Sequence, residues 1–374
     1  MSTEAPFLNE TTTTELITHS SKEPSYNIIT TVCGPLNASI SEEIAANDLT
    51  SRANYCYVLC AVLGFASALF LFYSFFRTYR AGTWNRLDTL LCALSISEFY
   101  IVLCSLSSLA HRPQYLQTTN LNCAIFSFFY NVAYFSGQLM LVLMGFVLIF
   151  DQDPPSTPLL QTALNKPIVC VGVTTLASLL SSVLLMGLLG ISRDPNNVYN
   201  IYKVTACRVD PCQASYIYSR TKLVLGFILP NLLLLALLGA GYLVWRRSNS
   251  SFLSRLKAFP VFLAVALVTF VCRIVYNGVL MKEVSLRVTD ELSPRQEALM
   301  SVAEFVLFSG SCASLVLLLL LHGPFRDGLR EVLCCHGMGG REANRHIMAP
   351  HIEIRDTQDM TTADDQETTT TNDH

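Results

Sequence analysis

The chain has 374 residues, of which 51% are hydrophobic and only 14% are charged, and its formal net charge is −3. Roughly a quarter of the residues of a soluble domain are charged, so this composition excludes an ordinary soluble protein, and the small net charge gives no reason to expect a nucleic-acid partner. The thirteen cysteines lie mostly singly in apolar stretches, without a CxxC pair. We interpret most of them as buried thiols and expect no metal and no cofactor.

Seven apolar stretches are long enough to cross a bilayer, which takes about 20 residues per helix. The sequence therefore predicts an all-α membrane protein, a seven-transmembrane helix bundle over residues 55–322. A short amphipathic helix at 323–335 and a disordered tail at 336–374 follow it. Residues 1–54 have no apolar core of a cleavable signal peptide, so we expect the first span to act as the signal anchor. The predicted spans are 55–76, 88–110, 121–150, 167–190, 223–245, 258–281 and 297–321.

Basic residues in short loops predict the orientation of the chain, because such loops stay in the cytoplasm. The loop after the third span is an exception, with Asp151, Asp153 and only Lys166. Two loops of three place the C-terminus in the cytoplasm and the N-terminus outside, in a multi-pass protein of the plasma membrane. The loops after the first and fifth spans carry bases and no acids: Arg77, Arg80, Arg86, Arg246, Arg247, Arg255 and Lys257.

The N-terminal segment 1–54 is polar and rich in Thr and Glu, a composition typical of disorder. Asn9 and Asn37 begin Asn-x-Ser/Thr tripeptides and are predicted glycosylation sites if this end faces the lumen. Asn249 begins a similar tripeptide in a predicted cytoplasmic loop, so we discount it. The acidic segment either attracts a basic protein ligand by long-range steering or serves as a solvated spacer.

Three charged residues stand within the predicted spans and away from the span ends: Glu98 in LCALSISEFY, Arg273 in FVCRIVYNGVLM and Glu304. A charge at membrane depth is costly and is usually paired or functional. We hypothesise that Arg273 pairs with Glu98, with Glu304 or with both. The alternative is that Arg273 faces a water-filled cavity.

The last predicted span is followed by GPFRDGLREVLCCHG from Gly323. A Gly-Pro break, a helix with one apolar side and the adjacent Cys334 and Cys335 are typical of an interfacial helix with palmitoylation sites. The tail beyond them mixes acids with threonines and cannot bury a core. Its candidate phosphorylation sites are Thr361, Thr362, Thr368 and Thr369.

Residues 297–335 resemble the seventh helix, eighth helix and lipid anchor of a rhodopsin-family (class A) G-protein-coupled receptor. The fifth span, LGFILPNLLLLALL, has Phe227 and Pro230 as chemokine receptors do. The sixth span retains Cys272, Tyr276 and Asn277 of the chemokine-receptor phrase Cys-Trp-x-Pro-Tyr-Asn. The resemblance covers roughly residues 52–335 and is nearest to chemokine receptors and to the herpesvirus-encoded proteins that resemble them.

The four cysteines expected outside the membrane allow two disulfides in three pairings, and the alternative is one bridge with two free thiols. The resemblance pairs Cys123, at the start of the third span, with one of the two cysteines in the following extracellular loop. On that basis we favour Cys123–Cys207, which leaves Cys33 to pair with Cys212.

The resemblance also implies a ligand site and cytoplasmic partners. Glu304 would anchor a basic, chemokine-like protein, with Tyr276 and Asn277 beside it. A heterotrimeric G protein would bind inside, and arrestin would recognise the phosphorylated tail. Glu98, Arg273 and Ser314 would form a polar network within the membrane.

Several receptor signatures are replaced in this chain. Residues 147–149 read Val-Leu-Ile where the family has Asp-Arg-Tyr, and Arg273 and Val275 replace the tryptophan and proline of the sixth span. The Asn-Pro-x-x-Tyr motif has become Ser314, Leu315 and Leu318, and the family's sodium-binding positions hold Gly137 and Ser314. These changes predict a receptor with atypical or constitutive signalling.

Two other functions stay open at this point. One is a non-signalling modulator or scavenger, including one that acts in receptor hetero-oligomers. The other is a transporter or channel in which the charges of the second, sixth and seventh spans line a polar path. We expect no enzyme activity, because the spans contain no Ser/His pair, no paired Asp and no His cluster for a metal.

Overall fold

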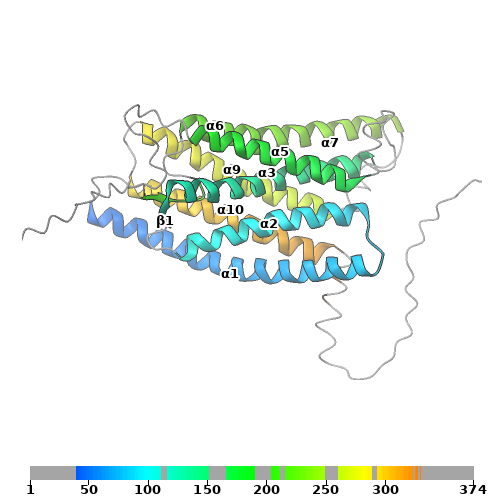
Figure 1. The fold of residues 1–374 in the computed structure, drawn as a ribbon, viewed down its shortest axis with the longest axis horizontal. Helices are drawn as coiled ribbons and strands as arrows, with labels where there is room; N and C mark the ends of the chain where they lie inside the picture. Colours follow the sequence, from blue (N-terminus) through cyan, green and yellow to red (C-terminus); the bar gives the residue numbers. More distant parts are fainter. Residues whose placement is uncertain are drawn as a thin grey trace, which may run out of the picture. The chain divides into compact units, whose positions relative to one another are not determined.

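The computed structural model describes residues 39–110, 116–150, 166–189, 204–210, 215–248, 260–288 and 293–322, together with Phe325, Arg326 and Leu329. Within these residues, seven helical segments are long and apolar enough to cross a membrane. The prediction of a seven-transmembrane, all-α fold is therefore confirmed. Figure 1 shows the helices running along one common direction.

The first span begins much earlier than the apolar pattern predicted. Helix α1 covers Ile40–Arg80, so residues 40–54, expected to belong to a disordered segment, are helical. The Ser39 side chain accepts a hydrogen bond from the Glu42 backbone, and acidic residues in the first turn favour a helix start through the helix dipole. Arg52 and Asp48, one turn apart, add an exposed ion pair. These local signals are polar and escape a search for apolar runs.

The next helices follow the predicted spans within a few residues. They are α2 (Arg86–Ala110), α3 (Asn120–Phe150) and α5 (Pro167–Leu189). The sixth and seventh spans are α9 (Pro260–Val288) and α10 (Pro294–Leu321). A capping box at Ser293 and Gln296 and a proline in the first turn begin α10.

The fifth span is built from three pieces: α6 (Tyr216–Leu223), a π-helical turn (Val224–Ile228) and α7 (Leu229–Ser248). Pro230 lies just after the π turn and has no backbone N–H, so it cannot bond the carbonyl of Gly226 one turn earlier. A Cβ at Gly226 would lie 2.6 Å from a ring carbon of Tyr134 and 2.7 Å from one of Phe135. Glycine is thus needed where this span meets α3.

Helix α3 lies at the centre of the bundle and packs against α2, α5, α7 and α9. Helix α10 packs against α1, α2 and α9, and Figure 1 shows it beside α1. By contrast α5 and α7 expose rows of large apolar side chains, such as Leu176, Leu180 and Leu235. These rows are the surfaces that contact lipid, as expected for helices at the edge of a membrane bundle.

After α10, Phe325, Arg326 and Leu329 are helical, in the region predicted to form the amphipathic helix 323–335. Phe325 is buried, and its ring lies 4.7 Å from that of Phe75 on α1 and 4.4 Å from that of His322. Arg326 is exposed, so the described residues have the apolar and polar sides that the sequence predicts.

Candidate functional site

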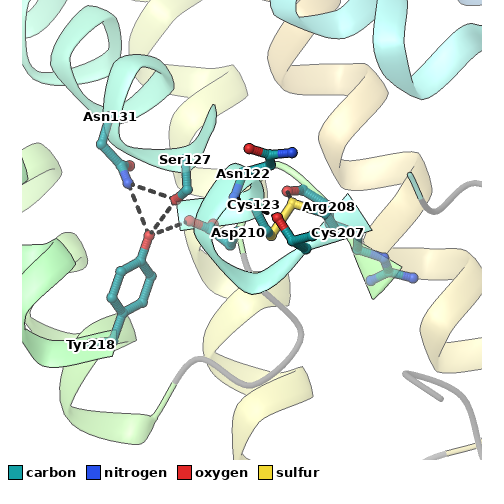
Figure 2. Close-up of a disulfide and its surroundings, with 9 residues drawn as sticks. Asn122, Cys123, Ser127, Asn131, Cys207, Arg208, Asp210 and Tyr218 are labelled. Carbon is teal, nitrogen blue, oxygen red and sulfur yellow. Dashed lines mark hydrogen bonds between the residues drawn. A yellow bond between two sulfur atoms is a disulfide. The ribbon is translucent and has the colours of Figure 1, made fainter. Parts of the chain in front are cut away.

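A disulfide joins the start of α3 to the loop that follows α5. Strand β1 (Leu116–Thr119) pairs antiparallel with β2 (Val204–Cys207), with Leu116 opposite Cys207. Cys207 is bonded to Cys123 with an S–S distance of 2.01 Å, which confirms the favoured pairing. The bridge fixes β2 against α3 (Figure 2), so the residues after Cys207 enter the bundle. Arg208, Val209 and Asp210 are all buried there.

Asp210 is the centre of a buried cluster of hydrogen bonds. Lys222 of α6 donates from Nζ to Oδ1 at 2.6 Å and to Oδ2 at 2.8 Å. Tyr218, one turn before Lys222, donates its hydroxyl to Oδ1 at 2.8 Å, and Tyr276 of α9 donates to Oδ2. Four charge-assisted contacts from three side chains compensate the desolvation of the carboxylate, which a buried ion pair needs to be tolerated.

Helix α3 extends this cluster through two polar side chains. Asn131 donates to the Tyr218 hydroxyl at 2.9 Å and to Ser127 Oγ at 3.2 Å, and Ser127 Oγ lies 3.3 Å from the same hydroxyl. Figure 2 shows the Tyr218 hydroxyl joined by dashed lines to Asp210, Ser127 and Asn131. The Lys222 ammonium also lies 5.1–5.3 Å from the ring centroids of three tyrosines, within the range of cation–π attraction. These are Tyr130, Tyr134 and Tyr276.

Arg208 forms a second charged cluster at the same end of the bundle. Its Nη1 lies 3.5 Å from Glu283 Oε1 on α9, and its Nη2 lies 3.4 Å from Glu297 Oε1 on α10. In Figure 2 the Arg208 side chain points away from Tyr218, whereas Asp210 points toward it. Arg208 therefore compensates acids of α9 and α10, whereas Asp210, two residues later, compensates the lysine of α6.

Deeper in the bundle, Arg273 of α9 is buried against α2 and α3. Its Nη2 lies 3.8 Å from Glu98 Oε1, and its Nη1 donates to the backbone carbonyl of Tyr134 at 2.6 Å. The guanidinium carbon lies 4.1 Å from the Tyr134 ring centroid. The hypothesised pairing of Arg273 with Glu98 is present as an ion pair at 3.8 Å, without a hydrogen bond, because Glu98 Oε1 accepts none from the described residues. Glu304 takes no part in it, and its Oε1 has no hydrogen-bond partner among the residues that the structure describes.

Gly137 makes room for this ion pair. A Cβ at Gly137 would lie 3.0 Å from Glu98 Oε1 and 3.2 Å from Arg273 Nη2. The side chain of Arg273 therefore fills the space beside Glu98 that Gly137 leaves open, and its guanidinium is the positive charge next to that acid. This explains in physical terms why glycine stands at this position of α3.

The other predicted site residues are buried but differ in their contacts. Tyr276 belongs to the Asp210 cluster, whereas Asn277 donates to the Tyr134 hydroxyl at 2.8 Å and to the Arg273 carbonyl at 2.7 Å. Within the described part of the chain, the Ser314 hydroxyl has no hydrogen-bond partner, so the structure does not connect it to Glu98 and Arg273.

The remaining predicted sites lie outside the described residues. They are the cysteines Cys33, Cys212, Cys334 and Cys335, the acceptors Asn9 and Asn37, and the threonines Thr361, Thr362, Thr368 and Thr369. Among the residues that are described, no group of three or more His, Cys, Asp or Glu side chains could hold a metal ion.

Sequence reasoning missed Asp210 and Lys222, although they form the shortest ion pair among the described residues. The apolar run of the fifth span begins at residue 223, so Lys222 stands just outside the predicted span. One sequence signal could have found Lys222: it stands four residues after Tyr218, on the same face of a helix that Ser215 caps. Asp210 gives a weaker signal, because an acid in a loop is ordinarily solvated.

Comparison with protein families and with curated proteins found no match to this chain. The functional conclusion therefore rests on the chain's own residues and their arrangement.

Proposed function

We propose that the chain is a cell-surface receptor of the rhodopsin-family type, similar to chemokine receptors and with atypical or constitutive signalling. The observation that carries the proposal is the Cys123–Cys207 bridge within a seven-helix bundle. It ties the start of α3 to a loop whose next residues contact α6, α9 and α10 inside the bundle. A receptor needs this coupling between an outer segment and several helices, because a ligand acts through contacts that differ between conformational states.

The buried charges support a receptor more strongly than a transporter. Asp210, Arg208 and Arg273 each lie within ion-pair distance of a residue of opposite charge on a helix. Side chains held in this way fix helices relative to one another, whereas a transport path needs charges that can release their partners to an ion or solute. A scavenger or modulator without signalling is the second candidate. It is favoured by Val147-Leu148-Ile149 at the inner end of α3, where no cation is present to engage a G protein.

The proposal includes a plasma-membrane location with the N-terminus outside. It includes a basic, chemokine-like ligand near Glu304, a G protein and arrestin as partners, and no catalytic activity. Glycosylation tests the orientation. The Asn9→Gln and Asn37→Gln variants should lose the glycosidase-sensitive mass of the protein, whereas the matched Asn249→Gln variant should keep it. A loss of that mass only in Asn249→Gln would reverse the orientation.

Signalling is tested in transfected cells by basal and chemokine-stimulated G-protein activation, with arrestin recruitment measured in parallel. Surface level is measured in the same cells. The proposal expects ligand-independent activation above that of cells without the chain. If neither G-protein activation nor arrestin recruitment were detected at a normal surface level, the result would favour the non-signalling modulator instead.

A further inference from the structure

The three residues after Cys207 have contacts that a bound ligand would make in the outer part of the bundle. Arg208 lies within ion-pair distance of acids on α9 and α10, and Asp210 binds the lysine of α6 and the hydroxyls of Tyr218 and Tyr276. Val209 between them is 1% exposed. This segment is a loop by sequence, yet it is as buried as the helix cores around it.

Both oxygens of the Asp210 carboxylate are bound by side chains of the helices. Both carboxylate oxygens accept hydrogen bonds from Lys222, and each also accepts one from a tyrosine hydroxyl. Lys222 is 0% exposed, so it would be an uncompensated buried cation if the carboxylate left. The donors come from α6 and α9, whereas the acceptor comes from the loop after β2. The site is therefore complete on the helices and is filled by a residue from outside them.

We propose that Arg208–Val209–Asp210 is an internal ligand of the bundle, and that Lys222, Tyr218 and Tyr276 form a carboxylate-binding site which Asp210 occupies. The disulfide at Cys207 keeps the segment at high local concentration beside its site, which favours the intramolecular contact over a free ligand. An external ligand for this site would carry a carboxylate and would have to displace Asp210. The assignment of the segment as a ligand rests on the proposed receptor function, whereas the carboxylate site itself rests on the contacts alone.

The test uses the purified full-length chain and sodium acetate as the probe. The Asp210→Gly variant removes the internal carboxylate and should lower the thermal midpoint by several degrees. Acetate should restore a large part of this loss at concentrations at least tenfold below those at which sodium chloride has an equal effect. Wild-type protein and the Asp210→Gly, Lys222→Met double variant should show no acetate response beyond that of chloride. Asp48→Gly is the matched control, because Asp48 pairs with Arg52 on the exposed surface of α1.

An Asp210→Gly protein that keeps the Cys123–Cys207 bridge but responds equally to acetate and chloride would overturn the proposal. If Asp210→Gly does not fold, the charge-reversed Asp210→Lys, Lys222→Asp variant decides. It should yield much more folded protein than either of its single variants. If all three variants failed to fold to the same extent, the proposed carboxylate site would be overturned.

Signalling separates this inference from the proposed function. Under both proposals, Asp210→Gly should change basal G-protein activation, and acetate should reverse the change. An acetate response of the purified protein without any G-protein signal would retain the carboxylate site and reject the receptor function. A basal signal that Asp210→Gly leaves unchanged would retain the receptor and reject the segment as its internal ligand.

Discussion

The close contact of Gly137 with the ion pair gives a quantitative prediction. In Gly137→Ala, the new methyl group would lie 3.0 Å from Glu98 Oε1 and 3.2 Å from Arg273 Nη2. Ordinary contacts begin at 3.4 Å, so both side chains must retreat by a few tenths of an ångström. Arg273 has little freedom to do so, because its other nitrogen is bonded to the Tyr134 carbonyl at 2.6 Å.

Two opposing terms set the size of the effect. Overpacking a filled site costs about 1–3 kcal/mol, whereas replacing a helical glycine with alanine gains up to about 1 kcal/mol in a solvated helix. We expect Gly137→Ala to be destabilised by roughly 1–2 kcal/mol. Gly172→Ala on α5 and Gly278→Ala on α9 are matched controls, since a Cβ at either position meets no atom within 4 Å. They should be neutral or slightly stabilised.

The assay is thermal unfolding of the purified variants, with the midpoint compared between Gly137→Ala and its two controls. A difference of about 2 kcal/mol corresponds to roughly 2–3 °C in the midpoint if the unfolding entropy scales with the 374 residues of the chain. The same substitution in a Glu98→Ala, Arg273→Ala background should cost less, because neither crowding side chain remains. Equal midpoints for Gly137→Ala and Gly172→Ala would show that Gly137 is not needed to accommodate the ion pair.

Three further predictions concern stability. The double variant Cys123→Ser, Cys207→Ser should lose roughly 2–5 kcal/mol of folding stability, because the bridge closes a loop with a sequence separation of 84. Measured without reductant, it should unfold at a lower temperature than the wild type. Arg273→Met should lose roughly 3–5 kcal/mol of folding stability, because it leaves the charge of Glu98 uncompensated. Adding Glu98→Leu should restore most of the lost thermal midpoint. No recovery would show that the pair is unimportant. Burial lowers the pKa of His322, so the unfolded chain binds a proton more readily than the folded chain. The free energy of unfolding should therefore fall as the pH drops below about 6.5. His322→Gln should flatten this dependence of stability on pH.

The sequence predicted the seven spans because bilayer-crossing helices leave a strong and local signal in hydropathy. It also predicted that Arg273 needs a carboxylate, because a buried guanidinium has few alternatives. The choice between Glu98 and Glu304 was not predictable, since it depends on the rotation of α2 and α10 about their axes and on the space that Gly137 leaves.

The Asp210 cluster was missed from the sequence for a different reason. Asp210 is in a loop and Lys222 is at a helix end, which are positions where charged residues are usually solvated. Both are buried in the structure because the loop after Cys207 enters the bundle beside α6, and that path is a property of the assembled fold. In the same way, the helical residues 40–54 follow from capping and charge, which do not register as apolar periodicity.

We propose that the bundle is a receptor in which Arg273 restrains α9 against α2 and α3. The most direct measurement is basal G-protein activation by Glu98→Leu, Arg273→Met compared with wild type at equal surface level, because the apolar pair keeps the fold while it removes the restraint. We predict a several-fold rise in basal activation. Equal activation by a correctly folded and equally expressed double variant would contradict it.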